Sequence, residues 1–391
     1  MIPLMKSTFL NEFETRKALS EFILTAPRLS MGENCIEFER KFAEYQGADD
    51  AVLFNSGGSA NLAIIQSLKN LGYLQDGDMV GFSALTWSTN VMPIIQLGMQ
   101  PIPIDCSIST LNIMASDVIE CIKKYPIKVL FLTNVLGFVG DIWEIKKVCD
   151  EKGIVLLEDN CESLGTETKY GKSGSFGVLS SFSFFVAHHM SSIEGGMVCV
   201  NDKKFSEMLR IVRANGWDRN LNAQQQHKWR EKYNISSEFE AKYTFYDLGY
   251  NIRPTEITGF LGNYQIQFLD EIIGTREKNY HRIVEVAKKN DDFFKLSTDH
   301  ISRLSNFSYP VVCKSTELRD FYIKQFSGAG IELRPLIAGN ITNQPFFKKY
   351  QKEEFNLPNC ELLHSNSFYF GNYPELTDVD IEAILSCLIS Y

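Results

Sequence analysis

The chain has 391 residues, of which 44% are hydrophobic, and a formal net charge of −9 at pH 7. This length can supply the core of one large and one smaller domain, and the negative charge argues against nucleic acid as a partner. The apolar runs are too short to span a membrane. The first residues lack the regions of a signal peptide, and the nine cysteines are scattered without a CxxC pair. We therefore expect a cytoplasmic protein with reduced thiols and no membrane partner; the many Lys, Asn, Ile and Phe residues indicate a bacterial source.

The first 260 residues alternate short apolar runs with amphipathic stretches, which is typical of a mainly parallel sheet flanked by helices. We expect strands at Ala51–Phe54, Asp78–Phe82, Gln100–Asp105, Lys128–Thr133, Ile154–Asp159 and Gly196–Val200. A charged helical region at 261–290 then leads to a smaller unit with a strand at Tyr309–Val312. We place a large domain at 1–265 and a small α+β domain at 266–391, which the N-terminal segment can join.

The polar segment 218–247 separates two stronger motifs. It fits a solvated loop with a helical piece and, equally well, an active-site loop, because long loops in compact domains are often functional.

A glycine-rich turn follows the first expected strand and opens a helix, at Asn55–Asn61. Glycines in such a turn let backbone N–H groups converge on an anion, and the helix N-terminus adds its positive end. Taken alone, Gly57-Gly58 is more often only a turn.

Two charged residues have both an ordinary and a functional interpretation. Asp159 ends an expected parallel strand, where open α/β sheets bind ligands, although such an aspartate is more commonly a helix N-cap. Arg334 stands before a proline, where an arginine is usually a surface residue, but its guanidinium group can bind a carboxylate or phosphate through two hydrogen bonds.

His188 and His189 are adjacent in sequence. Adjacent residues rarely point at one ion, and we therefore expect no metal site.

The segment 180–196 resembles the cofactor-anchoring segment of the DegT/StrS-type sugar aminotransferases, which are fold-type I pyridoxal-phosphate (PLP) enzymes. His188 stands at the position of the anchoring lysine of that family, six residues before Glu194. The resemblance extends from about residue 28 to residue 372 and includes further motifs at Glu158–Gly165, Arg213–Asn220, Gly249–Glu256 and Ala329–Leu336.

The resemblance implies an aspartate aminotransferase-like fold, in which a large domain with a mainly parallel seven-stranded sheet is followed by a small domain. It also implies roles for single residues. Gly57, Gly58, Ser59 and Ser183 would contact the cofactor phosphate, Trp87 would stack on the pyridine ring, and Asp159 would pair with the pyridine nitrogen. Glu162 would lie beside the cofactor, and Asn251 would reach the phosphate across the interface of a homodimer. Arg219, Arg253 and Arg334 would contact the substrate.

An imidazole cannot form a Schiff base with an aldehyde, so His188 argues against a covalently held cofactor and ordinary transamination. Together with Glu162, where the aminotransferases usually have Gln, it indicates the 3-dehydratase branch that acts on GDP-linked 4-keto-6-deoxy sugars, either hexoses or heptoses. The resemblance then implies that L-glutamate converts PLP to its amine form (PMP), that His188 is the base, and that ammonia is released. A CDP-sugar branch also has this histidine but carries an iron–sulfur cluster, for which the cysteine spacing here is unsuited. An aminotransferase and a catalytically inactive paralogue remain the alternatives.

Overall fold

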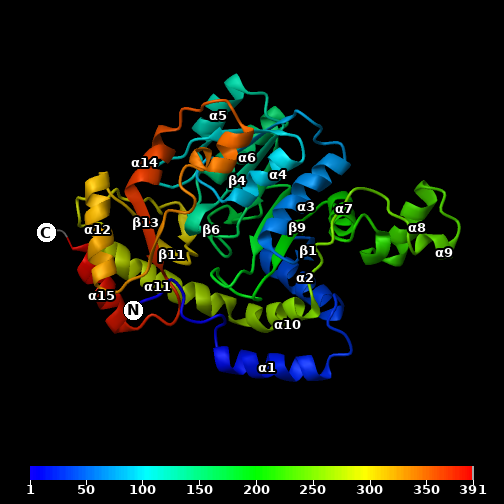
Figure 1. Ribbon diagram of the computed structural model, residues 1–391, viewed down its shortest axis with the longest axis horizontal. Helices are drawn as coiled ribbons and strands as arrows, with labels where there is room; N and C mark the ends of the chain where they lie inside the picture. The colour runs from blue at the N-terminus through cyan, green and yellow to red at the C-terminus, as the bar shows by residue number, and fades with distance from the viewer. Residues whose placement is uncertain (390–391) are drawn as a thin grey trace.

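The computed structural model describes residues 1–389, whose centre is a seven-stranded sheet of order β1-β9-β8-β5-β4-β2-β3 (Figure 1). The strands are β1 (Asp50–Phe54), β2 (Met79–Ser83), β3 (Gln100–Ile104), β4 (Val129–Thr133), β5 (Val155–Asp159), β8 (Leu179–Ser183) and β9 (Gly196–Val200). Strand β9 is antiparallel to both of its neighbours, and every other pair is parallel. The expected seven-stranded, mainly parallel sheet is confirmed.

Helices cover both faces of this sheet, and the alternation of side chains along each strand fills both sides. In β4, Val129 and Phe131 pack toward one helical layer, whereas Leu130 and Leu132 pack toward the other. The first layer contains α3 (Gly57–Asn70), α4 (Met92–Gln96) and α7 (Lys203–Arg213). The second contains α2 (Glu33–Gln46), α5 (Ala115–Lys124) and α6 (Ile142–Lys152).

The C-terminal unit is built around another sheet, which is antiparallel and has the strand order β11-β13-β12. Its elements are β11 (Ser308–Val312), α12 (Thr316–Gly328), β12 (Leu333–Pro335), α13 (Pro345–Tyr350), α14 (Pro358–Asn366), β13 (Ser367–Gly371) and α15 (Asp378–Leu388). The N-terminal segment lies against this unit, because Ile2 forms a parallel bridge with Ile331.

The chain reaches the C-terminal unit through α10 (Glu256–Gln265), a 3-10 turn η4 (Ile266–Phe268) and the long helix α11 (Leu269–Ala287). The domain boundary after residue 265 stays a prediction, and a helix ends at that residue. The remaining elements are α1 (Glu12–Thr25), the short strands β6 (Glu167–Thr168), β7 (Gly171–Lys172) and β10 (Ile301–Arg303), and the turns η1 (Ser88–Asn90), η2 (Val135–Gly137), η3 (Asp218–Asn220) and η5 (Ile341–Asn343).

The segment 218–247 carries two helices, α8 (Ala223–Lys232) and α9 (Glu238–Ala241), which project from the body at the right of Figure 1. The indole N–H of Trp229 donates to Glu207 of α7 at 3.1 Å, and this hydrogen bond connects the projecting helices to the helical layer that covers the large sheet. Across residues 1–389, no helix combines the length and apolar character needed to cross a bilayer.

Candidate active site

Asp159 is the last residue of β5 and lies at the carboxyl edge of the sheet, where it is 4% exposed. Its Oδ2 atom accepts hydrogen bonds from the side-chain amides of Asn61, at 2.8 Å, and Asn90, at 2.7 Å. Its Oδ1 atom accepts from the backbone N–H of Cys161 at 2.9 Å. No lysine or arginine within residues 1–389 forms an ion pair with it. The carboxylate is therefore held in a fixed orientation, and its charge is available to a cationic group.

The N-terminus of α3 forms a tight cradle beside Asp159. Ser56 caps the helix, since its Oγ accepts from the backbone N–H of Ser59 at 3.1 Å. A Cβ added at Gly57 would lie 2.8 Å from the Cβ of Ser183, and one at Gly58 would meet Thr89 at 3.0 Å. The glycines thus leave room for an anion at the start of the helix, and Ser183 lies beside Gly57.

Trp87 and Glu162 differ in their surroundings at this edge. Trp87 precedes η1 and is 55% exposed, so a face of its indole is open to a stacking group. Glu162 is half-buried and accepts a hydrogen bond from the backbone N–H of Leu136 at 2.9 Å. Burial, and then the charge of Asp159, raise the pKa of Glu162 to about 8, so this carboxyl is largely protonated at neutral pH.

His188 lies in the loop after β8. The loop is held by a hydrogen bond from the His188 N–H to the carbonyl of Phe185, at 2.9 Å, and the ring of Phe307 lies 5.4 Å from the imidazole. Burial lowers the pKa of His188 to about 4, although the charge of Asp159 opposes this. The imidazole is therefore neutral at pH 7, and its Nδ1 atom has no partner within residues 1–389.

We group eight residues at the carboxyl edge of the sheet under the name sheet-end pocket: Gly57, Gly58, Ser59, Trp87, Asp159, Glu162, Ser183 and His188. Arg334 belongs to the C-terminal unit, where it lies opposite Tyr369 of β13 across the small sheet. Burial raises the pKa of Tyr369 to about 12, and the charge of Glu162 adds to this rise while that of Arg334 opposes it. Arg334 itself is half exposed and pairs with Glu332 at 2.6 Å.

The other predicted residues, Arg219, Asn251 and Arg253, lie together elsewhere. They line a cleft of about 720 Å³, which we call the arginine cleft, together with Arg28, Arg210 and Arg213. The guanidinium of Arg253 donates to the Asn251 side chain at 3.0 Å. None of the residues of the sheet-end pocket is among those that line this cleft in the described chain. The two groups are nevertheless linked through the backbone, because the N–H of Asn55, beside the cradle, donates to the carbonyl of Ile252 at 3.1 Å.

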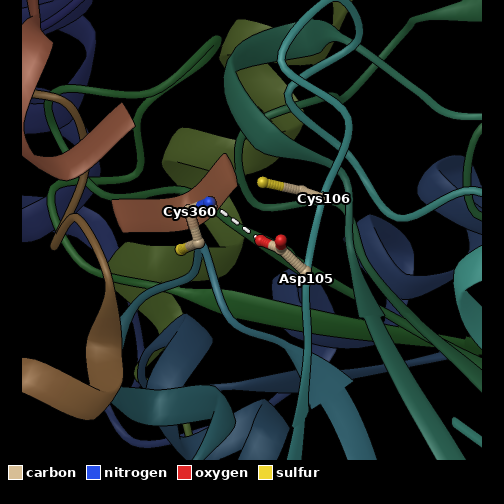
Figure 2. Close-up of side chains that lie close together, drawn as sticks. All are labelled: Asp105, Cys106 and Cys360. Carbon is tan, nitrogen blue, oxygen red and sulfur yellow. Dashed lines mark hydrogen bonds between the residues drawn. The ribbon is translucent and has the colours of Figure 1, made fainter. Parts of the chain in front are cut away.

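A third cluster was not predicted from the sequence and consists of Asp105, Cys106 and Cys360 (Figure 2). Their ligand atoms lie within 4.8 Å of one another, although Cys106 and Cys360 are 254 residues apart in the chain. Asp105 accepts from the backbone N–H groups of Asn359, at 3.0 Å, and Cys360, at 2.8 Å. Its carboxylate therefore caps α14 and joins it to the end of β3, while both thiols are buried among apolar side chains.

The chain matches the family model "DegT/DnrJ/EryC1/StrS aminotransferase family" over residues 11–389. It has the PLP-dependent transferase fold, because its backbone matches the Helicobacter pylori aminotransferase PseC with a TM-score of 0.83, at 20% identity over 99% of this chain and 96% of that one. The chain belongs to the DegT/DnrJ/EryC1/StrS family, and the resemblance noted in its sequence is confirmed.

Within the family, the chain is similar to dehydratases. It is 32% identical to the GDP-4-keto-6-deoxy-D-mannose 3-dehydratase of Escherichia coli O55:H7, over 95% of both chains. A solved structure of GDP-4-keto-6-deoxymannose-3-dehydratase with a trapped PLP–glutamate geminal diamine matches with a TM-score of 0.90, at 30% identity over 99% of this chain and 100% of that one.

Proposed function

We propose that this protein is a PLP/PMP-dependent 3-dehydratase that removes the C3 hydroxyl of a GDP-linked 4-keto-6-deoxy sugar. The observation that carries the proposal is His188, a neutral imidazole at the position where the aminotransferases of the family hold a lysine. Similarity to the E. coli dehydratase over 95% of both chains supports the same reaction class.

The residues of the sheet-end pocket fit the cofactor. Asp159 offers a buried carboxylate to a pyridine nitrogen, Trp87 offers an exposed ring face, and the cradle at Gly57 and Gly58 suits a phosphate. When bound, the cofactor supplies an electron sink for bond cleavage at the sugar. The protein would hold this cofactor in place without binding it covalently.

His188 is proposed as the base because it is neutral and its Nδ1 atom is free to accept a proton. A positioned base in the correct protonation state at the working pH contributes strongly to a proton-transfer step. The neutral carboxyl of Glu162 lies at the same edge, where its O–H can donate a hydrogen bond while the group still accepts one from the Leu136 N–H.

The proposal implies L-glutamate as a second substrate and another copy of the chain as a partner. L-glutamate would convert PLP to PMP, and turnover would release ammonia. Asn251 and Arg253, which line the arginine cleft, would serve the pocket of a second subunit in a homodimer, as the family resemblance implies.

One experiment separates this proposal from its alternatives, which are a nucleotide-sugar aminotransferase and an inactive paralogue. The protein is incubated with PLP, L-glutamate and GDP-, CDP- or dTDP-linked 4-keto-6-deoxy sugars, and ammonia and the sugar products are measured. We expect ammonia and a 3-deoxy sugar with the GDP substrate. An amino sugar without ammonia would indicate the aminotransferase, and no product would indicate the inactive paralogue.

A second measurement tests the absence of a covalent anchor. Borohydride treatment of the protein with PLP reduces any Schiff base to a stable adduct, so we expect no pyridoxyl-peptide from this site by mass spectrometry. A stoichiometric adduct on a nearby lysine would contradict the proposal.

A further inference from the structure

Arg276 on α11 is a buried arginine with a single hydrogen-bond acceptor. It is 4% exposed, and its Nη2 atom donates to the backbone carbonyl of His188 at 3.2 Å. Its Nε and Nη1 atoms have no partner within residues 1–389. The described chain places no carboxylate at ion-pair distance from it, although Glu375 lines the same small cavity.

Such an arrangement is unfavourable for folding, because a buried charge needs a partner to offset its desolvation. Burial lowers the pKa of Arg276 to about 10, with the charge of Glu375 opposing. The guanidinium therefore remains charged at neutral pH, and its positive field acts on the neighbouring loop. An unsatisfied buried group of this kind calls for an explanation.

The loop that contains His188 and His189, which we call the histidine loop, is also held by residues of the C-terminal unit. The Nε2 atom of the fully buried His189 lies 3.0 Å from the carbonyl oxygen of Ser305, and Phe307 contacts both histidine rings. Asn372 donates to the backbone carbonyl of Arg276 at 2.9 Å. These contacts hold the histidine loop in place, and Arg276 is the charged residue among those that make them.

We propose that Arg276 is a positioning residue for His188, whose backbone carbonyl it holds while its positive charge lies beside the histidine loop. This inference rests on the proposed role of His188 as the base. Arg276 lies behind the loop and acts only through His188.

The sign of the effect follows from the charged groups that face the imidazole. Asp159 at the end of β5 favours the protonated ring, whereas Arg276 from α11 and His189 from the same loop disfavour it. Glu375 partly offsets the field of Arg276. Removal of the Arg276 charge should therefore raise the pKa of His188, and removal of the Glu375 charge should lower it.

The test is NMR titration of the protein with labelled histidine, with and without PLP, from about pH 8 down to about pH 3, a range that includes both the ordinary histidine pKa and the lowered pKa of His188. The His188 signal is identified by its loss in His188→Asn. In the native protein we expect its midpoint at about 4. In Arg276→Gln we expect its midpoint to rise by about one pH unit or more, the usual effect of a nearby charge, while Arg276→Lys keeps the low midpoint.

The matched control is Arg282→Gln, which removes a half-exposed arginine of the same helix that pairs with Asp378 at 2.7 Å; no shift of His188 is expected. An unchanged midpoint in a folded Arg276→Gln protein, or equal shifts in the Gln and Lys variants, would overturn the proposal. If Arg276→Gln does not fold, Glu375→Gln decides, because an upward or absent shift there contradicts the predicted sign. The titration needs no sugar substrate, so it can be read even if the dehydratase function fails.

Discussion

The sheet-end pocket and the arginine cleft differ in how the fold holds their polar groups. In the pocket, Asp159 is almost fully buried and receives three hydrogen bonds. In the cleft, Arg219 and Asn251 are exposed, and the guanidinium of Arg219 rests on the ring of Trp217 at 5.6 Å. The polar groups of the pocket are thus held in place by their own chain, whereas those of the cleft are open to solvent.

The difference extends to charge. Arg210 and Arg213, at the back of the cleft, are neutralised by Glu39, and Arg210 also pairs with Asp50 at 2.7 Å. The front of the cleft keeps its positive charge, which suits the diphosphate of a nucleotide sugar. The pocket instead contains a neutral imidazole and a largely neutral carboxyl beside one carboxylate. We infer that chemistry and substrate attraction are assigned to different surfaces.

The largest expected effect comes from His188→Asn in the pocket. The amide cannot accept a proton at neutral pH, so dehydration should fall by about 10²–10⁴ or more, while cofactor binding persists because Asp159 and the glycine cradle remain. Ammonia release and cofactor absorbance measure the two properties separately. The control is His227→Asn on the exposed helix α8, which should behave as the native protein. Near-native ammonia release by His188→Asn would show that His188 is not the base.

The next effect concerns Asp159→Asn, which keeps the shape of the side chain but removes its charge. The hydrogen bond of a charged group is worth about 1.5–3 kcal/mol, so cofactor affinity should fall by about tenfold to a hundredfold. Equilibrium dialysis of PLP and PMP measures the loss. Equal affinity in the variant would mean that Asp159 does not face the pyridine nitrogen, and the three donors around it would then serve the fold alone.

Arg253→Ala should have a smaller effect and should show which pocket the cleft serves. We expect KM for the GDP-sugar to rise by about tenfold, the effect of losing one charge-assisted contact, with kcat little changed. Co-expression with His188→Asn then tests the composite site. If the cleft serves the partner's pocket, mixed dimers regain one native site, and activity exceeds the sum of the two separate variants. Activity equal to that sum would place the cleft and the pocket in one subunit.

The sequence predicts much of the frame on which both regions depend. Six strands of the large sheet were located within one residue at each end, because each is an apolar run bounded by polar residues. Strand β8 was missed as a strand, since its Leu-Ser-Ser-Phe-Ser sequence is polar in composition, although all five residues are buried.

The supports of the site could not be predicted in this way. Asn61 and Asn90 contact Asp159 from 98 and 69 residues away, and a single asparagine in a helix or turn gives no local signal. Arg276 lies in a region predicted only as a charged helix, where burial depends on the packing of the C-terminal unit. The residues that matched a family motif could thus be named as candidates from the sequence, whereas the residues that position them require the tertiary fold.

The smallest expected effect concerns Glu162, whose pKa sets the pocket's charge. Its pKa in the folded protein is raised from an ordinary value of 4.5 to about 8. At pH values between these two pKa values, the protein therefore takes up a proton when it folds. The native protein should lose stability as pH rises through this window, and Glu162→Gln should lack that part of the slope. Dehydration should likewise decline above about pH 8 in the native protein, because the ionised carboxylate places a second negative charge beside Asp159. Urea midpoints and rates at about pH 6 and pH 9 measure both. An identical pH dependence in the Gln variant would show that Glu162 ionises normally, and the charge contrast between the pocket and the cleft would then be weaker than the structure indicates.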